Sequence, residues 1–368
     1  MSDRFAVIAG GGTAGHVHPG IAVARALVER GHPASDVLYV GSDRGIEHEL
    51  VPPAGFELVT LPGKGIPRSV SLAALRAVGA LLHGVVSGLR LLGRERPRVV
   101  LSLGGFAAVP CAMAAWIRRI PVVVHEQNAV PGAANRLIGR WARAAAVSFP
   151  DTPLPRATVT GNPVRPEMVR VDRIHDRAAA RRALGVGPDQ LMVVVTGGSL
   201  GALRLNRATI AAATALSERA DLTVYHVVGA RDWDLLAPDR QRIDGPIDYR
   251  AIRYEDDMPT VFAAADVVVS RAGASTTAEI AVVGVPAILV PLPGAPGDHQ
   301  TANASALVAA GGAIMVPDDR FDGPALVSAI DSLCADSDRL RRMSDAARTV
   351  GRADAADHVA RLLEEHAS

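Results

Sequence analysis

The sequence predicts an α/β protein made of two doubly wound domains whose parallel sheets face a cleft between the domains. Short β-branched runs bounded by glycine or proline recur along the chain, and alanine-, leucine- and arginine-rich segments with helical periodicity separate them. Such alternation of buried strands and helices favours parallel sheets covered on both faces. The predicted strands are Phe5–Ala9, Val37–Val40, Val99–Leu103, Val122–His125, Met192–Thr196, Thr223–Val228, Val267–Ser270 and Ala287–Val290.

A weak internal repeat predicts that the two domains are alike. The first strand leads into the glycine loop 11–15 and a helix, and a later strand leads into the glycine loop 197–201 and a helix. Ser102 and Ser270 then lie at matching positions of two strands of similar sequence, each followed by another glycine turn. In doubly wound sheets these turns lie at the carboxyl ends of the strands, where ligands bind.

The join between the domains is predicted near residues 160–166, where two prolines and a glycine interrupt regular structure. We therefore expect an N-terminal domain over residues 1–163 and a C-terminal domain over residues 164–349. Two such domains facing each other would bring both sets of glycine loops to one ligand-binding cleft.

Charge is distributed unevenly along the 368 residues. The chain has 39 Lys+Arg and 38 Asp+Glu, but residues 1–160 carry 17 basic and 10 acidic side chains, against 22 and 28 in residues 161–368. We expect the basic half to face an anionic partner. Nucleic acid is not that partner, because aromatic residues for base stacking make up only 4% of the chain and the whole chain is near neutral.

The cysteines and the apolar segments bear on the cellular compartment. Cys111 and Cys334 are the only cysteines, so a disulfide framework is excluded and a reducing cytosol is expected. Residues 1–12 lack the pattern of a secretory signal, which predicts a protein that is not exported. The most apolar region, residues 70–92, is too interrupted by charge to span a membrane.

The first glycine loop predicts an anion or sugar site. Gly10, Gly12 and Gly15 have the spacing of a dinucleotide fingerprint, but the second predicted strand lacks the acidic residue that would hold a ribose. The alternative is a tight turn that binds nothing, but four glycine turns after four strands make this less attractive. His16 starts the following helix and is a candidate general base; His18 is the alternative, and both histidines could instead be polar helix-start residues.

The segment 270–279 predicts a diphosphate site in the second domain. Its small residues would let a ligand approach the backbone, three consecutive hydroxyls lie beside free helix N–H groups, and Glu279 could hold ribose hydroxyls. The commoner meaning of a Ser/Thr-x-x-Glu pattern is a capping box that satisfies only its own helix. The position after a strand favours the ligand.

Other polar runs follow predicted strands. Residues 298–303 supply amide, hydroxyl and imidazole groups suited to sugar hydroxyls, although exposed polar loops are ordinary. Residues 125–128 close a buried strand with four consecutive polar side chains, a placement that packing alone does not explain. Asp232 and Asp234 have the spacing that some sugar transferases use for a divalent metal, but they lie in what reads as a surface connection, and we predict no metal site.

The stretch 64–98 predicts a helix with a basic and an apolar face. It carries seven basic residues and one acid, and Arg76, His83 and Arg90 recur every seven residues. Leu72, Leu75, Leu82 and Leu89 mark the other face. An interfacial helix at an anionic bilayer and a solvated face on an ordinary core helix remain equal alternatives.

Taken together, the motifs resemble those of the MurG family of peptidoglycan N-acetylglucosaminyl transferases over almost the whole chain. They are Gly11-Gly-Thr-Ala-Gly-His-Val-His-Pro-Gly20, Gly104-Gly-Phe106, His125-Glu-Gln-Asn128, Gly161-Asn-Pro-Val-Arg165, Gly197-Gly-Ser-Leu-Gly-Ala202, Asp256-Asp-Met258, Arg271-x-Gly-Ala…Glu279 and Asp298-His-Gln300.

The resemblance implies a GT-B fold of two Rossmann-like domains and a C-terminal helix, about residues 350–368, that returns to the first domain. It implies inverting transfer of N-acetylglucosamine from UDP-N-acetylglucosamine to the 4-hydroxyl of undecaprenyl-diphosphoryl-N-acetylmuramyl pentapeptide, which converts lipid I to lipid II. The enzyme would be peripheral, at an anionic membrane surface on the cytoplasmic face. It would require no cofactor or metal, and its partners would include cell-wall and division proteins.

The resemblance also assigns residues of the donor and acceptor sites. The predicted UDP-N-acetylglucosamine contacts are Thr13, Ala14, Gly15, Asn128, Arg165, Ser199, Ile252, Tyr254, Ala274, Ser275, Thr276, Glu279 and Gln300. The predicted acceptor or membrane residues are Gly104, Gly105, Phe106, Arg68, Arg76 and Arg90. The predicted catalytic residues are His16 and Glu126, and which of these or a water takes the proton stays open.

Two alternatives belong to other functional classes. A UDP-N-acetylglucosamine epimerase also uses two facing domains and the same nucleotide sugar, but it needs neither a lipid acceptor nor a membrane surface. A nucleotide-sugar sensor would bind without turnover. The basic amphipathic segment favours the transferase over the epimerase, and the polar groups at His16, Glu126 and Asn128 argue against a sensor.

Overall fold

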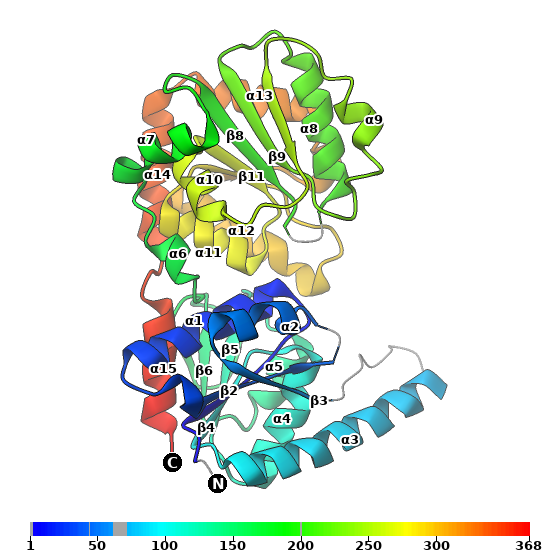
Figure 1. The fold of residues 1–368 in the computed structure, drawn as a ribbon, viewed down its shortest axis with the longest axis vertical. Helices are drawn as coiled ribbons and strands as arrows, with labels where there is room; N and C mark the ends of the chain where they lie inside the picture. Colours follow the sequence, from blue (N-terminus) through cyan, green and yellow to red (C-terminus); the bar gives the residue numbers. More distant parts are fainter. Residues whose placement is uncertain (1–2, 44, 62–71, 199–200) are drawn as a thin grey trace. The chain divides into compact units, whose positions relative to one another are not determined.

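The computed structural model describes residues 3–43, 45–61, 72–198 and 201–368, with only the backbone described at residues 72–78, 106 and 107. The chain divides into two compact units (Figure 1). Unit 1 comprises residues 1–165 and 352–368, and unit 2 comprises residues 166–351. Each unit is a parallel sheet between two layers of helices, the α/β architecture that the alternating sequence pattern predicts.

The sheet of unit 1 has seven strands in the order β3-β2-β1-β4-β5-β6-β7, and every neighbouring pair is parallel. This order reverses direction beside β1, so the β1 and β4 carboxyl ends form a topological switch point. The strands are β1 (Ala6–Ala9), β2 (Val37–Ser42), β3 (Glu57–Leu61), β4 (Val99–Ser102), β5 (Val122–Glu126), β6 (Ala144–Val147) and β7 (Ala157–Val159).

Helices cover both faces of this sheet. One apolar core joins the sheet to α1 and α15, and a second joins it to α3, α4 and α5. The α-helices of unit 1 are α1 (Ala14–Glu29), α2 (Glu47–Leu50), α3 (Leu72–Glu95), α4 (Gly105–Ile117), α5 (Ala133–Ile138) and α15 (Ala355–His366). Short 3-10 turns are η1 (Ala34–Asp36) and η2 (Pro52–Ala54).

The C-terminal helix α15 packs beside α1 (Figure 1). Its apolar face, including Val359 and Leu363, is buried in the first core. Charged contacts hold its other side: Arg30, the C-cap residue of α1, binds Glu364 at 2.6 Å and Asp357 at 2.8 Å. The last turn of the chain is therefore an integral part of unit 1.

The long helix α3 lies along α4 and leaves one side exposed (Figure 1). Leu89 packs against the second core, but Leu82 is 61% exposed and Val86 is 45% exposed. The apolar face predicted from the leucine spacing is thus only partly used for packing. Within the described part of the chain, no helix combines the length and apolar composition needed to cross a bilayer.

The sheet of unit 2 has six strands in the order β10-β9-β8-β11-β12-β13, again all parallel. The strands are β8 (Leu191–Thr196), β9 (Leu222–Val227), β10 (Asp248–Ile252), β11 (Val267–Ser270), β12 (Ala287–Leu289) and β13 (Ala313–Met315). The α-helices are α6 (Pro166–Val169), α7 (Arg173–Leu184), α8 (Leu203–Ala215), α9 (Ala237–Arg240), α10 (Met258–Ala264), α11 (Ala274–Val283), α12 (His299–Ala310), α13 (Gly323–Cys334) and α14 (Ser337–Val350). Two 3-10 turns are η3 (Pro296–Asp298) and η4 (Asp318–Arg320).

The internal repeat seen in the sequence is confirmed by the topology. The order β3-β2-β1-β4-β5-β6 in unit 1 matches the order β10-β9-β8-β11-β12-β13 in unit 2. Ser102 pairs with Ala9 in the first sheet, and Ser270 pairs with Thr196 in the second. All eight predicted strands are present with ends shifted by at most two residues, whereas β3, β6, β7, β10 and β13 were not predicted.

The largely buried carboxylate of Asp266 ties α7 to the sheet of unit 2. Asp266 accepts hydrogen bonds from Arg177 (2.6 Å), Arg181 (2.7 Å) and the backbone N–H of Met192 (2.8 Å). Arg181 is 3% exposed. Removing one partner of a buried pair leaves the other charge uncompensated, which is costly.

We expect Asp266→Asn to lower the free energy of unfolding by about 3 kcal/mol, because Arg181 would keep its buried charge without a carboxylate. Chemical unfolding of the full chain measures this loss. The matched control is Asp239→Asn, whose carboxylate lies 3.7 Å from Arg242 on the surface and should change stability by less than about 0.5 kcal/mol. Equal effects of the two substitutions would contradict the assigned role.

Candidate active site

In unit 1 the predicted glycine turns, His16, Glu126 and Asn128 lie at or just beyond the carboxyl ends of β1, β4 and β5. The loop after β1 approaches the turn after β4 so closely that a Cβ on Gly105 would lie 3.1 Å from the carbonyl oxygen of Gly11. A Cβ on Gly104 would lie 3.1 Å from Nδ2 of Asn135. Both glycines have a positive φ, +87° at Gly104 and +77° at Gly105. Backbone conformation and close packing therefore both require glycine here.

His16 lies in the first turn of α1, where the sequence predicted it. Thr13 is the N-cap residue, and its Oγ1 lies 2.9 Å from Nδ1 of His16. If Nδ1–H donates to Thr13, the lone pair of His16 is on Nε2, the form that a general base needs. Burial lowers the pKa of His16, while the charges of Glu126 and Glu47 oppose this effect. The ring is therefore neutral at neutral pH.

Glu126 is 2% exposed and holds the loop that follows β5. Its Oε1 accepts from the backbone N–H (3.0 Å) and the side-chain amide (3.3 Å) of Asn128. Its Oε2 accepts from the N–H of Gly132 (3.0 Å) and from Asn135 (2.8 Å). Each carboxylate oxygen thus has two donors, an arrangement that fixes the backbone around Asn128.

His125 precedes Glu126 and is completely buried. The side-chain amide of Gln127 donates to its Nδ1 (3.2 Å) and to the carbonyl oxygen of Leu103 (3.1 Å), so Nε2 carries the proton and donates to Gly161 (3.3 Å). Burial lowers the pKa of His125 to about 4. His125 is a neutral structural link between β5 and the segment before Arg165.

In unit 2, the predicted phosphate turn is the N-terminus of α11. Gly273 is the N-cap residue and makes no side-chain capping bond. Thr276 is the third residue of the helix rather than its cap, and the hydroxyl of Thr277 donates back to the carbonyls of Gly273 and Ala274 at 3.1 and 3.0 Å. The capping-box alternative is therefore wrong. The helix start has the geometry of an anion site.

The other predicted donor residues of unit 2 lie at the carboxyl ends of neighbouring strands. Ile252 ends β10, and Tyr254, two residues later, is 55% exposed. Ala274, Ser275, Thr276 and Glu279 lie in the first two turns of α11 and are partly exposed. Gln300 lies in the first turn of α12, where its Oε1 accepts the N–H of Leu292 at 2.9 Å and fixes the intervening loop.

The second glycine loop also requires glycine at a particular position. Gly201 has φ +77°, and a Cβ there would lie 2.7 Å from the carbonyl oxygen of Val228, at the end of the neighbouring strand. A Cβ on Gly197 would lie 2.5 Å from the backbone N of Ala202. Gly197 and Gly201 are therefore packed as closely as the glycines after β1 and β4.

The structure describes some of the predicted residues only in part or not at all, and it places others away from these strand ends. Arg68 and Ser199 lie outside the described residues, and only the backbone is described at Arg76 and Phe106. Arg90 is exposed on α3. Arg165 is half-buried at the last position of the first segment of unit 1.

Of the Asp-x-Asp pair, Asp234 is exposed as predicted, but Asp232 is buried, so the prediction of a surface position is wrong for Asp232. Asp232 is 3% exposed and its carboxylate binds Asn206 (3.0 Å) and Arg231 (3.3 Å). Asn206 in turn binds His226 at 3.0 Å. In the described part of the chain, no group of three or more His, Cys, Asp or Glu residues has the geometry of a metal site.

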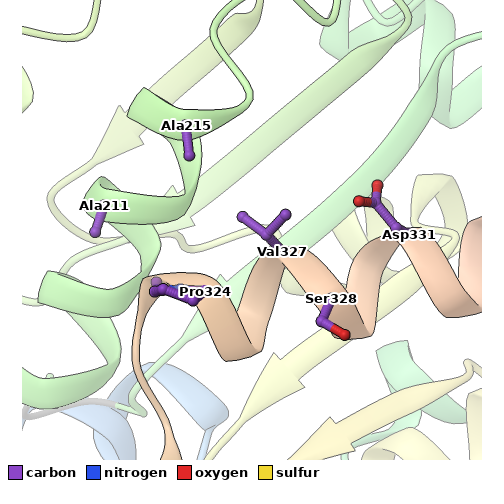
Figure 2. A pocket seen from close by; sticks show the side chains of 7 residues that line it. Ala211, Ala215, Pro324, Val327, Ser328 and Asp331 are labelled. Atoms are coloured by element: carbon purple, nitrogen blue, oxygen red, sulfur yellow. The ribbon is translucent and has the colours of Figure 1, made fainter.

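A shallow groove on unit 2 lies away from these strand ends. Figure 2 shows it between the second half of α8 and the start of α13. Its floor is mainly apolar, with one carboxylate at the edge. The lining residues are Ala211, Ala215, Gly323, Pro324, Val327, Ser328 and Asp331. The groove contains none of the predicted site residues.

Sequence reasoning missed two buried residues that shape the unit 1 site, Glu47 and Asn135. Asn135 donates to the carbonyl oxygen of His125 (3.0 Å) as well as to Glu126. Glu47 accepts the N–H of Gly12 at 2.9 Å. Neither belongs to a motif with a recognisable spacing, because each acts through a contact with a distant segment.

Comparison with known proteins decides the family. The model of the glycosyltransferase family 28 N-terminal domain matches residues 6–147, and the model of its C-terminal domain matches residues 192–359. A curated relative from a Nocardioides species is 41% identical over 98% of this chain and 97% of its own length. It is named UDP-N-acetylglucosamine:N-acetylmuramyl-(pentapeptide) pyrophosphoryl-undecaprenol N-acetylglucosamine transferase. The chain belongs to the MurG family.

Solved structures agree with membership of the MurG family. MurG of Acinetobacter baumannii superposes with a TM-score of 0.76 and 26% identity, covering 99% of this chain and 100% of that one. The GT-B fold expected from the motifs is thereby confirmed. A UDP-N-acetylglucosamine 2-epimerase from Neisseria meningitidis, solved with its nucleotide sugar, has a TM-score of 0.68 and 14% identity, covering 99% of this chain and 100% of that one. This second likeness shows the fold alone.

Proposed function

We propose that the chain transfers N-acetylglucosamine from UDP-N-acetylglucosamine to the 4-hydroxyl of undecaprenyl-diphosphoryl-N-acetylmuramyl pentapeptide, the lipid I to lipid II step of peptidoglycan synthesis. The observation that carries this proposal is full-length similarity to curated transferases of that name, at 41% identity. The two glycine loops and the polar strand ends of each unit supply the chemistry that such a transfer needs.

Unit 2 is the proposed donor-binding domain. The N-terminus of α11, at Ala274, Ser275 and Thr276, would hold the diphosphate, with Arg165 and Ser199 completing its contacts. Glu279 would hold the ribose hydroxyls, and Gln300 the sugar hydroxyls. Ile252 and Tyr254 would border the uracil. The helix dipole and the N–H groups at the start of α11 favour an anion there.

Unit 1 is the proposed acceptor domain. His16 would accept the proton of the attacking 4-hydroxyl through Nε2, with Thr13 holding Nδ1. Thr13, Ala14, Gly15 and Asn128 would contact the donor sugar, and Gly104, Gly105 and Phe106 would contact the acceptor. Because four donors engage Glu126, its proposed part in catalysis is to hold Asn128 in place rather than to take the proton.

A single displacement gives inversion at the anomeric carbon. The 4-hydroxyl attacks the face opposite UDP, the C1–O bond to the diphosphate breaks, and the electron pair leaves with UDP. The developing negative charge would be stabilised by the start of α11 and by Arg165. These groups supply positive charge from the protein itself, so we propose that no cofactor or divalent metal is required.

An anionic membrane surface is the proposed location of the acceptor. Leu82 and Val86 are exposed on α3 near the exposed His83 and Arg90, a pattern that suits the boundary between headgroups and acyl chains. Arg68 and Arg76 would extend this basic surface. We propose peripheral attachment at the cytoplasmic face, with cell-wall and division proteins as partners and cell shape and division as the processes served.

The experiment that tests the proposal follows radiolabel from UDP-N-acetylglucosamine, with and without a short-chain lipid-linked muramyl pentapeptide and in the presence of a metal chelator. We expect label to enter the lipid fraction only when the acceptor is present. Label that stays in the nucleotide pool would contradict the transferase, and restoration by magnesium would contradict metal independence.

Glu279→Ala tests the donor site separately. We expect KM for UDP-N-acetylglucosamine to rise about tenfold or more with little change in kcat, because a carboxylate that holds ribose acts equally in the ground and transition states. Steady-state kinetics measure the two constants. An unchanged KM would contradict the ribose assignment.

The second candidate is an epimerase acting on the same nucleotide sugar. The fold likeness at 14% identity supports it, but the curated relatives at about three times that identity are named as transferases. Conversion of the nucleotide sugar in the absence of any acceptor would favour the epimerase.

A further inference from the structure

A carboxylate with no ion-pair partner among the described residues is buried directly behind the first glycine loop. Glu47 is the first residue of α2 and is 0% exposed. Its Oε1 accepts hydrogen bonds from the N–H of Gly12 (2.9 Å) and from the N–H and hydroxyl of Ser42 (3.0 Å each). Its Oε2 is also buried and has no hydrogen-bond partner among the described residues.

Three glycines make room for this carboxylate. A Cβ on Gly11 would lie 1.6 Å from Oε1, and a Cβ on Gly45 would lie 1.6 Å from Oε2. A Cβ on Gly41 would lie 3.0 Å from Cγ. The loops after β1 and β2 are therefore both shaped around the side chain of Glu47.

Stability alone is a poor explanation for this arrangement. A charged group taken out of water loses several kcal/mol of hydration, and an apolar side chain of similar size would fill the same space more favourably. The carboxylate also takes the N–H of Gly12, which a phosphate in the loop would otherwise use. A function in the neighbouring site accounts for both features.

The contact with Gly12 sets the start of α1. Gly12 has φ +90°, the next residue, Thr13, is the N-cap of α1, and His16 follows in the first turn. A hydrogen bond that fixes the amide plane at Gly12 therefore fixes the position of the Thr13–His16 pair.

We propose that Glu47 is a positioning residue for the transfer reaction, which fixes the loop that carries Thr13 and His16 and places a negative charge near the His16 ring. This inference rests on the proposed function, in which His16 takes the acceptor proton. It concerns a residue that makes no contact with the reacting atoms, since its carboxylate is buried behind the loop.

The groups that face the His16 ring act in opposite directions. Burial lowers the pKa of His16, and the charges of Glu126 from β5 and Glu47 from α2 raise it. His125 from β5 is neutral, because burial holds its pKa at about 4. Burial and the charge of Glu47 raise the pKa of the Tyr39 hydroxyl, which stays protonated.

The first test measures the His16 ring directly. An NMR titration of the full chain, with His16 assigned from a His16→Gln sample, compares the wild type with Glu47→Gln. We expect the pKa of His16 to fall by roughly half a pH unit in Glu47→Gln, because a nearby negative charge has been removed. The control is Glu49→Gln, an exposed carboxylate on the same helix, which should leave it unchanged. Equal titration curves for all three proteins would overturn the proposal.

The second test separates positioning from a general loss of folding. We expect Glu47→Gln to lower kcat about tenfold or more, to shift the acid limb of its pH profile to lower pH, and to change the affinity for UDP-N-acetylglucosamine much less than it changes kcat. A lower kcat with an unshifted acid limb would show a purely structural role and contradict the proposal. The NMR titration does not depend on turnover, so failure of the proposed function and failure of this inference are distinguishable.

A double-mutant cycle with Gly45 tests the packing around the carboxylate. The methyl group of Gly45→Ala would collide with Oε2, so the substitution should lower kcat about tenfold in the wild type and hardly at all in a Glu47→Ala background. Losses that multiply in the double variant would contradict the assigned contact. This cycle also covers the case in which one Glu47 substitution does not fold.

Discussion

His16→Ala should reduce kcat by about a hundredfold to ten-thousandfold while the dissociation constant for UDP-N-acetylglucosamine changes by less than about twofold. The imidazole is proposed to take the proton of the acceptor hydroxyl, a step in which donor binding has no part. Thr13 fixes its Nδ1 at 2.9 Å, which leaves Nε2 for the substrate. Single-turnover kinetics give the rate, and calorimetry gives the dissociation constant.

His18→Ala is the matched comparison, because it removes the other histidine of the same helix start. We expect this variant to keep most of the activity. Equal losses in kcat and in donor affinity for His16→Ala, or a larger kcat loss for His18→Ala, would contradict the assignment of the base to His16.

The pH profile follows from the same geometry. A base must be unprotonated, so activity is lost as the pH falls through the pKa of His16. Burial lowers that pKa below the ordinary histidine value, so the acid limb should lie below a pH of about 6.5. Measurements of kcat between roughly pH 5 and 8, the range over which histidine titrates, locate the acid limb. An acid limb well above that value would contradict a base whose pKa is lowered.

Glu126→Gln should destabilise the chain by about 2 kcal/mol or more and lower kcat more than tenfold. Both carboxylate oxygens accept two donors, so whichever way the new amide is turned, its NH2 group faces two N–H groups. Buried donors left without an acceptor cost about 1–3 kcal/mol each. Chemical unfolding and steady-state kinetics measure the two effects on the same preparations.

Asp151→Asn is a suitable control, since it removes an exposed carboxylate from unit 1 and should change neither quantity. The pairing of the two effects is informative. Loss of activity with unchanged stability would contradict the positioning role and would favour Glu126 as the proton acceptor.

The central strands could be predicted because they are buried on both faces. Val267–Ser270 reads as an unbroken β-branched run, as expected for the interior of a parallel sheet. The strands that the sequence did not predict lack such a β-branched run. β6 is Ala144–Val147, three alanines and a valine, and alanine disfavours strands by propensity. The edge strand β10 is only partly buried along its whole length and carries charged residues.

The two anion sites could be predicted from the sequence, because a glycine loop or helix start that follows a strand has a fixed place in a doubly wound sheet. The role of Glu47 could not be predicted, because it depends on a contact with Gly12, 35 residues away. The burial of Asp232 could not be predicted for the same reason, since its buried partner Asn206 lies on another element. Such partners are set by tertiary packing, which local patterns do not encode.

The most direct measurement of the central claim is a proton NMR time course of UDP-N-acetylglucosamine, a soluble analogue of the lipid-linked acceptor and the protein in one tube. Anomeric proton signals report the configuration and identity of every sugar as it forms. We predict that the α-linked nucleotide sugar disappears only when acceptor is present and that a β-linked disaccharide appears at the same rate. An α-linked disaccharide, or a new nucleotide sugar formed without acceptor, would contradict a single inverting displacement by this chain.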